Sequence, residues 1–352
     1  MAYKLAKPYS LSLMTSWRFL ALGLALSLCL VWAVGRPELR DPRELLASAK
    51  EKLQDVAGSA AAAATPAPAV GRLSPGVRPL VLFAYAESAT ARKDLAFFVR
   101  NGLHGRADFV FVFNGPTNAT AMVPTGLPNV WTVQRDNSCF DMGAMGEVLR
   151  ADGLWRRYRR FITMNASLRG PFVPVYSSAC WTDVFLDRVT DTNKLVGLSP
   201  NCFPRPHVQS MLWATDAVGM AILLDESRAL SVPHADNFGT VDDPVGLSPC
   251  YPNWFKAVHA EVGTTELITA AGYTVDVMLT SFHGLASDLQ SYCNITDNAQ
   301  DHFRNKSYFG SNVHPYETVF FKANRKIDVA LLDHLTEWHM NMERTSWDTC
   351  GR

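Results

Sequence analysis

Between residues 79 and 164 the chain alternates short, continuously apolar runs with longer segments of helical periodicity. Apolar runs without polar alternation are typical of strands that are buried on both faces, as in parallel sheets. Strands that alternate with helices at this interval predict βαβ units, and therefore an α/β fold with a mostly parallel sheet flanked by helices. We expect strands at 79–85, 109–113, 129–133 and 161–164, and helices at 89–103 and 142–154.

The predicted strand at 161–164 ends in small polar residues, an arginine and a Gly-Pro break. In an open α/β sheet, ligands bind just beyond the carboxyl ends of the strands. Asn165, Ser167 and Arg169 would place two neutral hydrogen-bonding groups and one cation there, which suits a phosphate or a sugar. An ordinary strand exit with solvated polar residues is the alternative interpretation.

Residues 19–35, FLALGLALSLCLVWAVG, contain no charged side chain and follow a mildly basic segment at 1–18. Two interpretations fit this run: a cleaved signal peptide, with small residues at 33–35, or an uncleaved transmembrane signal anchor. We favour the anchor, because the basic head is long. The positive charges then keep residues 1–18 in the cytoplasm and place the rest of the chain in the lumen.

Residues 36–76 are rich in alanine and proline and have no means of building a core, which is typical of a stem. Residues 77–352 then form a single lumenal domain. This order predicts a single-pass type II protein of the Golgi or endoplasmic reticulum membrane, in contact with the lipid bilayer through residues 19–35.

The charge balance and the cysteines narrow the class further. The chain has 33 basic and 33 acidic residues, which argues against a nucleic-acid partner.

Six of its seven cysteines fall outside the apolar run and form no CxxC pair, so up to three disulfides or free buried cysteines are expected. No GxGxxG follows the first strand and no P-loop occurs, which argues against dinucleotide and NTPase sites.

Four N-x-S/T sequons occur, at Asn118, Asn165, Asn294 and Asn305. They would accept glycans in a lumenal domain. Because a glycan on Asn165 would obstruct the predicted site, we expect that asparagine to be unmodified.

Two segments carry a resemblance to a known family. Residues 135–144 read RDNSCFDMGA, and residues 164–172 read MNASLRGPF. They resemble the R-x-N-x-x-F-D-x-G-A and M-N-x-S-x-R-G-P-F motifs of sugar-chain transferases related to the rhamnan-synthesis protein F group. Weaker similarity continues through 207–210, 213–216 and 314–317 and covers most of 79–325.

The resemblance implies a glycosyltransferase of hexosyl or deoxyhexosyl type with a GT-A-like, Rossmann-like fold. Such an enzyme moves a sugar from a nucleotide-sugar donor to a glycan or glycoprotein acceptor in the secretory pathway. GT-A enzymes usually hold Mn²⁺ or Mg²⁺ with a D-x-D pair, where this chain has Asn165-Ala166-Ser167. Metal dependence is therefore open, and a catalytically inactive carbohydrate-binding member is the alternative.

The resemblance also assigns roles to residues. Asp141 would bind the nucleoside, although a helix N-cap is the simpler role for it. Asn165, Ser167 and Arg169 would serve the diphosphate. Asp216 would deprotonate the acceptor hydroxyl, with an N-cap again as the alternative.

The remaining candidates are weaker. Glu317 is an alternative base, and His207 and Gln209 are expected to contact the acceptor. We expect Glu261 and Glu266 to be solvated charges on a surface helix. A lumenal hydrolase is the third class, and no G-x-S-x-G or H-E-x-x-H motif supports it.

Overall fold

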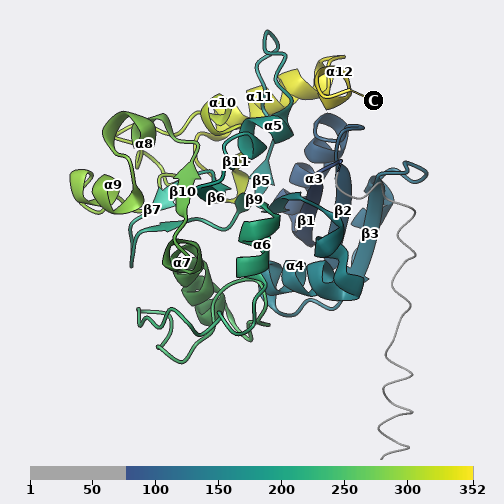
Figure 1. Cartoon of the computed structure of the whole chain (residues 1–352). Coiled ribbons are helices and arrows are strands. Elements are labelled where there is room, and N and C mark those ends of the chain that lie inside the picture. The colour runs from purple at the N-terminus through teal and green to yellow at the C-terminus, as the bar shows by residue number, and fades with distance from the viewer. Residues whose placement is uncertain (1–76, 352) are drawn as a thin grey trace, which may run out of the picture. The chain divides into compact units, whose positions relative to one another are not determined.

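The computed structural model describes residues 77–351. Its centre is a seven-stranded sheet in the order β10-β6-β9-β4-β1-β2-β3 (Figure 1). Its strands are β1 (Leu80–Ala86), β2 (Asp108–Asn114), β3 (Val130–Arg135), β4 (Arg160–Asn165), β6 (Asn193–Gly197), β9 (Leu212–Asp216) and β10 (Thr274–Val277). All pairs are parallel except the two that β9 makes with β4 and β6. The predicted α/β fold with a mostly parallel sheet is confirmed.

Two short antiparallel pairs flank this sheet: β5 (Leu168–Arg169) with β11 (Phe321–Lys322), and β7 (Pro200–Asn201) with β8 (His207–Val208). The α-helices are α3 (Ala89–Asn101), α4 (Phe140–Arg150), α5 (Trp181–Leu186), α6 (Ala217–Leu223), α7 (Trp254–Ala270), α8 (Thr280–Leu285), α9 (Leu289–Ile295), α10 (Pro315–Thr318), α11 (Val329–Asn341) and α12 (Ser346–Thr349). Short 3₁₀ turns are η1 (Ala119–Met122), η2 (Ala151–Arg157) and η3 (Ala323–Arg325).

Helices cover both faces of the sheet. Helix α7 contacts both α4 and α6, and α3 contacts α11 (Figure 1). The strands and helices predicted as far as residue 164 are all present, with boundaries shifted by a few residues. The largest difference is at 142–154, where α4 begins at Phe140 and gives way to η2 at Ala151.

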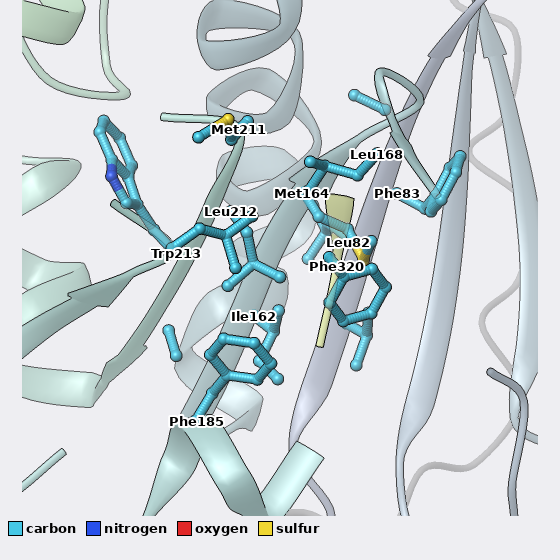
Figure 2. Close-up of a cluster of buried hydrophobic side chains, with 14 of the residues drawn as sticks. Leu82, Phe83, Ile162, Met164, Leu168, Phe185, Met211, Leu212, Trp213 and Phe320 are labelled. Atoms are coloured by element: carbon cyan, nitrogen blue, oxygen red, sulfur yellow. The ribbon is translucent and has the colours of Figure 1, made fainter. Parts of the chain in front are cut away.

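Aromatic side chains fill the space between the sheet and α3. Phe98 of α3 lies 4.9 Å from the ring of Phe83 in β1 and 5.8 Å from the ring of Trp181 in α5. Figure 2 shows a second part of the core, where Ile162 of β4 and Leu212 of β9 lie among other buried side chains. Strands that are apolar on both faces therefore have a helical layer on each side to bury them.

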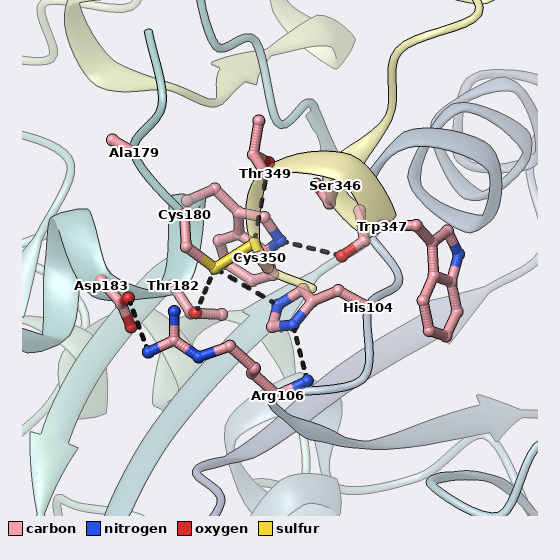
Figure 3. Close-up of a disulfide and its surroundings, with 12 residues drawn as sticks. His104, Arg106, Ala179, Cys180, Thr182, Asp183, Ser346, Trp347, Thr349 and Cys350 are labelled. Carbon is pink, nitrogen blue, oxygen red and sulfur yellow. Dashed lines mark hydrogen bonds and ion pairs between the residues drawn. A yellow bond between two sulfur atoms is a disulfide. The ribbon is translucent and has the colours of Figure 1, made fainter. Parts of the chain in front are cut away.

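All six cysteines of the described residues are paired, which confirms the expectation of up to three disulfides. The pairs are Cys139–Cys250, Cys180–Cys350 and Cys202–Cys293. The bond shown in Figure 3 ties the end of α12 to the start of α5, and His104 lies beside it. Burial lowers the pKa of His104 to about 3, so its ring is neutral. Its Nδ1 accepts a hydrogen bond from the backbone N–H of Arg106.

Within residues 77–351, no helix combines the length and apolar character needed to cross a bilayer. The predicted span at 19–35 and the predicted stem at 36–76 lie outside the described residues. Both remain predictions.

Candidate functional site

The site lies where the direction of the chain along the sheet reverses. From β1 the chain proceeds outward to β2 and β3, and then returns to place β4 on the other side of β1. The segments that leave the carboxyl ends of β1 and β4 diverge, which leaves a crevice between them. A cleft of about 480 Å³ opens at these ends. It is lined by Ala84, Tyr85, Ala86, Ser88, Thr90, Ala91, Asn114, Asn137, Phe140, Asp141, Asn165, Ala166, Ser167, Lys322 and Asn324.

The first turns of α3 and α4 both form part of this lining. Ser88 caps α3, its Oγ accepting the N–H of Ala91 at 3.0 Å. Free N–H groups and the helix dipole make such N-termini favourable for anions. Lys322 of β11 is the one cation among the described residues that line the cleft. The cleft is therefore suited to a phosphate group.

Asp141, Asn165 and Ser167 form a hydrogen-bonded group in the cleft. The Asn165 amide donates to Asp141 Oδ2 at 2.5 Å, and the Ser167 hydroxyl donates to Asn165 Oδ1 at 2.6 Å. Burial raises the pKa of Asp141, the hydrogen bond from Asn165 opposes this rise, and the nearby charge of Glu261 adds to it. The structure thus brings three of the four predicted donor-binding residues together.

The turn before Asp141 is fixed by contacts with the loop that precedes α7. Cys139 and Phe140 have positive φ values of 67° and 54°, which are costly for residues other than glycine. The disulfide from Cys139 to Cys250 fixes this turn. At Gly146 a Cβ atom would lie 1.6 Å from the carbonyl oxygen of Leu247, so only glycine allows the loop and α4 to approach so closely. The position of Asp141 therefore depends on the loop before α7.

Glu261 of α7 lies near the cleft, contrary to our expectation of a solvated surface charge. It accepts hydrogen bonds from the backbone N–H of Ser210, at 3.0 Å, and from the Ser210 hydroxyl. Burial alone would raise its pKa, but His207, Ser210 and the charge of Lys322 lower it to about 2. Glu266 is the surface charge that we expected, and it pairs with Arg205 at 2.7 Å.

Arg169 differs from the prediction, because its guanidinium does not line the cleft. Its Nε donates to Asp94 at 2.8 Å, and the two side chains are 5% and 0% exposed. This buried ion pair ties β5 to α3. The cation at the cleft comes instead from β11, which pairs with β5 and supplies Lys322.

The prediction for Asp216 requires a correction, because Asp216 lies at the opposite end of the strands from Asn165, away from the cleft. Strand β9 runs against β4, so Asp216 is in register with Arg160 at the start of β4, whereas Asn165 is at its end. Asp216 caps α6 by accepting the N–H groups of Val218 and Gly219 at 3.0 Å. Its second oxygen accepts from Lys194 at 2.6 Å. The N-cap interpretation describes it, and the base assignment does not.

The other three candidates do not line the cleft either. Glu317 accepts hydrogen bonds from the backbone N–H of Thr280 at 2.8 Å and from the Tyr308 hydroxyl at 2.6 Å, which ties α10 to α8. His207 and Gln209 are 1% and 2% exposed. They stabilise the segment around β8 and have no surface to offer an acceptor.

Lys322 was not predicted as a site residue, and Glu261 was predicted to be a solvated charge. Lys322 is the first charged residue after the apolar run at 319–321. A charge that directly follows such a run is a candidate for the ligand-binding end of a strand. Glu261 is surrounded on α7 by alanine, glycine and threonine. A helix whose residues are small or apolar on all sides is usually buried. That pattern argued against a solvated face.

The described residues that line the cleft do not fit the divalent metal of a D-x-D enzyme. Asp141 is the single carboxylate among them, and both of its oxygens already accept hydrogen bonds. Mg²⁺ and Mn²⁺ need several oxygen ligands, usually with more than one carboxylate. We therefore derive no step through a metal at this site.

No family model and no curated protein matches the chain. It resembles the solved structure of a cytidylyltransferase from Leptospira borgpetersenii, at 8% identity and TM-score 0.28, over 42% of this chain and 63% of that one. It resembles mannosyltransferase PcManGT from Pyrobaculum calidifontis in complex with GDP-Man and Mn²⁺, at 12% identity and TM-score 0.34, over 58% and 56%. The apo glycosyltransferase GlyE of Streptococcus pneumoniae gives 9% identity and TM-score 0.26, over 40% and 34%.

The chain covers less than two thirds of each of these structures. Structures this distant say nothing about the function of the chain.

Proposed function

We propose that this protein is a glycosyltransferase that transfers a sugar from a nucleotide-sugar donor, with the donor bound in the cleft between β1 and β4. The observation that supports this most is the position of the cleft. It lies at the carboxyl ends of parallel strands where the strand order reverses, which is where open α/β sheets bind nucleotides. The motifs at 135–144 and 164–172 support the same class.

The diphosphate is assigned to Lys322 and to the first turns of α3 and α4. A lysine ammonium beside two helix N-termini supplies the positive potential that a D-x-D enzyme obtains from its metal. Asn165 and Ser167 add neutral hydrogen-bonding groups at the same edge. The enzyme would then bind its donor without a metal at the diphosphate.

Asp141 is assigned to the nucleoside, where its carboxylate accepts hydrogen bonds from ribose or base. As the single carboxylate among the described lining residues, it is also placed to accept a proton from the acceptor. The kinetics of Asp141→Asn separate these roles. Loss of a nucleoside ligand raises KM for the donor, whereas loss of a base lowers kcat with KM unchanged.

A non-catalytic carbohydrate-binding protein with the same fold is the second candidate. One observation favours it: the described residues that line the cleft include a single carboxylate, so they lack the acid pair with which a metal-dependent transferase holds its metal. Such a protein would bind a sugar or nucleotide sugar without cleaving it.

We further propose that the domain is lumenal and anchored in a Golgi or endoplasmic reticulum membrane by residues 19–35. Three disulfides support an oxidising compartment. The sequon asparagines Asn118, Asn294 and Asn305 are exposed, whereas Asn165 is hydrogen-bonded within the cleft. Endoglycosidase digestion of the chain from cell membranes should reveal glycans that N165Q retains and that N118Q or N294Q reduces.

The function is tested by incubating the full-length protein with a panel of UDP-, GDP- and CMP-linked sugars, with and without EDTA. We expect hydrolysis or transfer from at least one donor, which persists in EDTA and is strongly reduced in Lys322→Met. Lys326→Met removes an exposed lysine nearby and should leave the rate unchanged. Binding without turnover would favour the carbohydrate-binding protein, and neither binding nor turnover would contradict both.

A further inference from the structure

We propose that His234, Asp236 and His259 form a binding site for a divalent transition-metal ion of the zinc class. His234 and Asp236 lie in the loop between α6 and α7, and His259 lies in the second turn of α7. One ligand atom from each residue lies within 4.8 Å of the others. None of the three lines the cleft, so the site is separate from the proposed donor site.

The carboxylate lies between the two imidazoles. Asp236 Oδ2 is 3.1 Å from His259 Nδ1 and 3.4 Å from His234 Nε2. The other oxygen, Oδ1, accepts the backbone N–H groups of Phe238 at 2.7 Å and Gly239 at 2.9 Å. One oxygen thus fixes the carboxylate and the other is left to face the histidines.

The protonation of His234 leaves an unpaired ligand atom. Its Nδ1 lies 3.3 Å from the carbonyl oxygen of Val232, which can only accept, so Nδ1 carries the proton. Nε2 then presents a lone pair toward a carboxylate oxygen. Two such atoms repel each other unless a cation lies between them.

Further observations point to a ligand. Nε2 of His234 and Nε2 of His259 are buried and have no hydrogen-bond partner, and the residues are 5% and 0% exposed. Buried polar atoms without partners are rare and need an explanation. The two rings stack with their centroids 4.2 Å apart and 11° between their planes. Because a metal ion lies near the plane of each imidazole that binds it, one ring has to turn before both nitrogens can reach one ion.

Two glycines make room for the rings. A Cβ atom on Gly263 would lie 2.1 Å from His234 Cε1, and one on Gly239 would lie 2.4 Å from the ring of His259. Any larger residue at either position would displace a histidine. The local chain is thus shaped around both imidazoles.

The donor set defines the class of metal. Two imidazole nitrogens and one carboxylate oxygen suit Zn²⁺ and neighbouring ions, and not Mg²⁺ or Ca²⁺, which prefer oxygen ligands. Three protein ligands leave a fourth tetrahedral position for water. Bound metal would tie the loop to α7. The same loop carries Cys250, whose disulfide holds the turn before Asp141.

The other group of similar composition in the described residues, His104 with Cys180 and Cys350, does not qualify. Its two sulfurs are joined in a disulfide and are not thiolates. This leaves the cluster at the start of α7 as the candidate metal site.

The test uses the full-length protein in detergent, stripped with EDTA, loaded with Zn²⁺ and desalted. We expect about one equivalent of retained zinc, and a rise in Tm of about 5 °C when Zn²⁺ is supplied well above its Kd. His234→Asn and His259→Asn should each lose the retained zinc and the Tm rise. His339→Asn removes another buried histidine outside the cluster and should retain both.

A second measurement does not depend on the folding of variants. Co²⁺ added to the stripped wild-type protein should give the visible absorption bands of a tetrahedral site, and Zn²⁺ should abolish them. The proposal is overturned if wild-type protein retains no zinc and gives no cobalt bands. It is equally overturned if folded His234→Asn and His259→Asn retain as much zinc as wild type.

Discussion

Asp141 and Asp216 have the same local setting in the sequence, yet they lie at opposite ends of the strands of the sheet. Each stands where a helix begins after a strand. Asp141 follows β3, which runs with β1, and it lines the cleft. Asp216 follows β9, which runs against β4, and it caps α6 and pairs with Lys194. Strand direction therefore decides whether such an aspartate reaches the ligand-binding edge.

We expect the largest loss of stability when Asp216 is replaced. Asp216→Ala removes a cap and leaves Lys194, whose side chain is 5% exposed, without its partner. We expect a loss of about 3 kcal/mol in the free energy of unfolding, measured by urea denaturation. Donor binding should be unchanged. Asp187→Ala, in a pair whose aspartate is 73% exposed, should cost less than about 1 kcal/mol. A defect in donor binding by stable Asp216→Ala protein would restore Asp216 to the site.

Glu261 and Glu266 make a second comparison within α7. The depressed pKa of Glu261 means that its ionised form stabilises the fold above its unfolded pKa. This contribution is lost as the pH falls from about 4.5, the unfolded pKa, through about 2, the folded pKa. Glu261→Gln should therefore cost roughly 2 to 3 kcal/mol at pH 7 and much less near pH 2.

Glu266→Gln removes a partly exposed ion pair and should cost less than about 1 kcal/mol at pH 7. Denaturant titrations at several pH values measure both variants. A cost for Glu261→Gln that is small, or that does not change with pH, would show that Glu261 is solvated after all.

At the ligand-binding edge the expected effects are on affinity. Lys322→Met removes a charged hydrogen bond to phosphate, which is worth about 1.5 to 3 kcal/mol, so Kd for a nucleoside diphosphate should rise about 10- to 100-fold. Isothermal titration measures this change. Lys326→Met is the matched control. Equal weakening by both variants would indicate general electrostatics and no specific contact.

The smallest expected effect is at Asp141. Asp141→Asn keeps the size of the side chain and removes the charge, so Kd for the diphosphate should rise about tenfold. Its Tm should stay within about 2 °C of wild type. Asp136→Asn changes an exposed aspartate five positions earlier and should leave Kd unaltered. A Tm loss without a change in Kd would make Asp141 a helix-capping residue like Asp216.

Much of the fold could be predicted from the sequence, because buried parallel strands are apolar throughout and their helices have clear periodicity. The position of Asn165 and Ser167 beyond a strand end followed from the apolar run at 161–164, whereas Asp141 was assigned to the site through the motif resemblance. The direction of β9 did not, since a short strand reads the same in both directions. Nor did the partner of Arg169: Asp94 is 75 residues away along the chain, and only the packing of α3 against β5 brings them together.

The most direct test of the account is an experimental structure of the protein with a bound nucleoside diphosphate. We predict that the diphosphate lies beside the Lys322 ammonium and the first turns of α3 and α4, with the nucleoside at Asp141. A diphosphate bound at the opposite edge, near Asp216 and Lys194, would contradict the assignment of the cleft between β1 and β4 as the donor site.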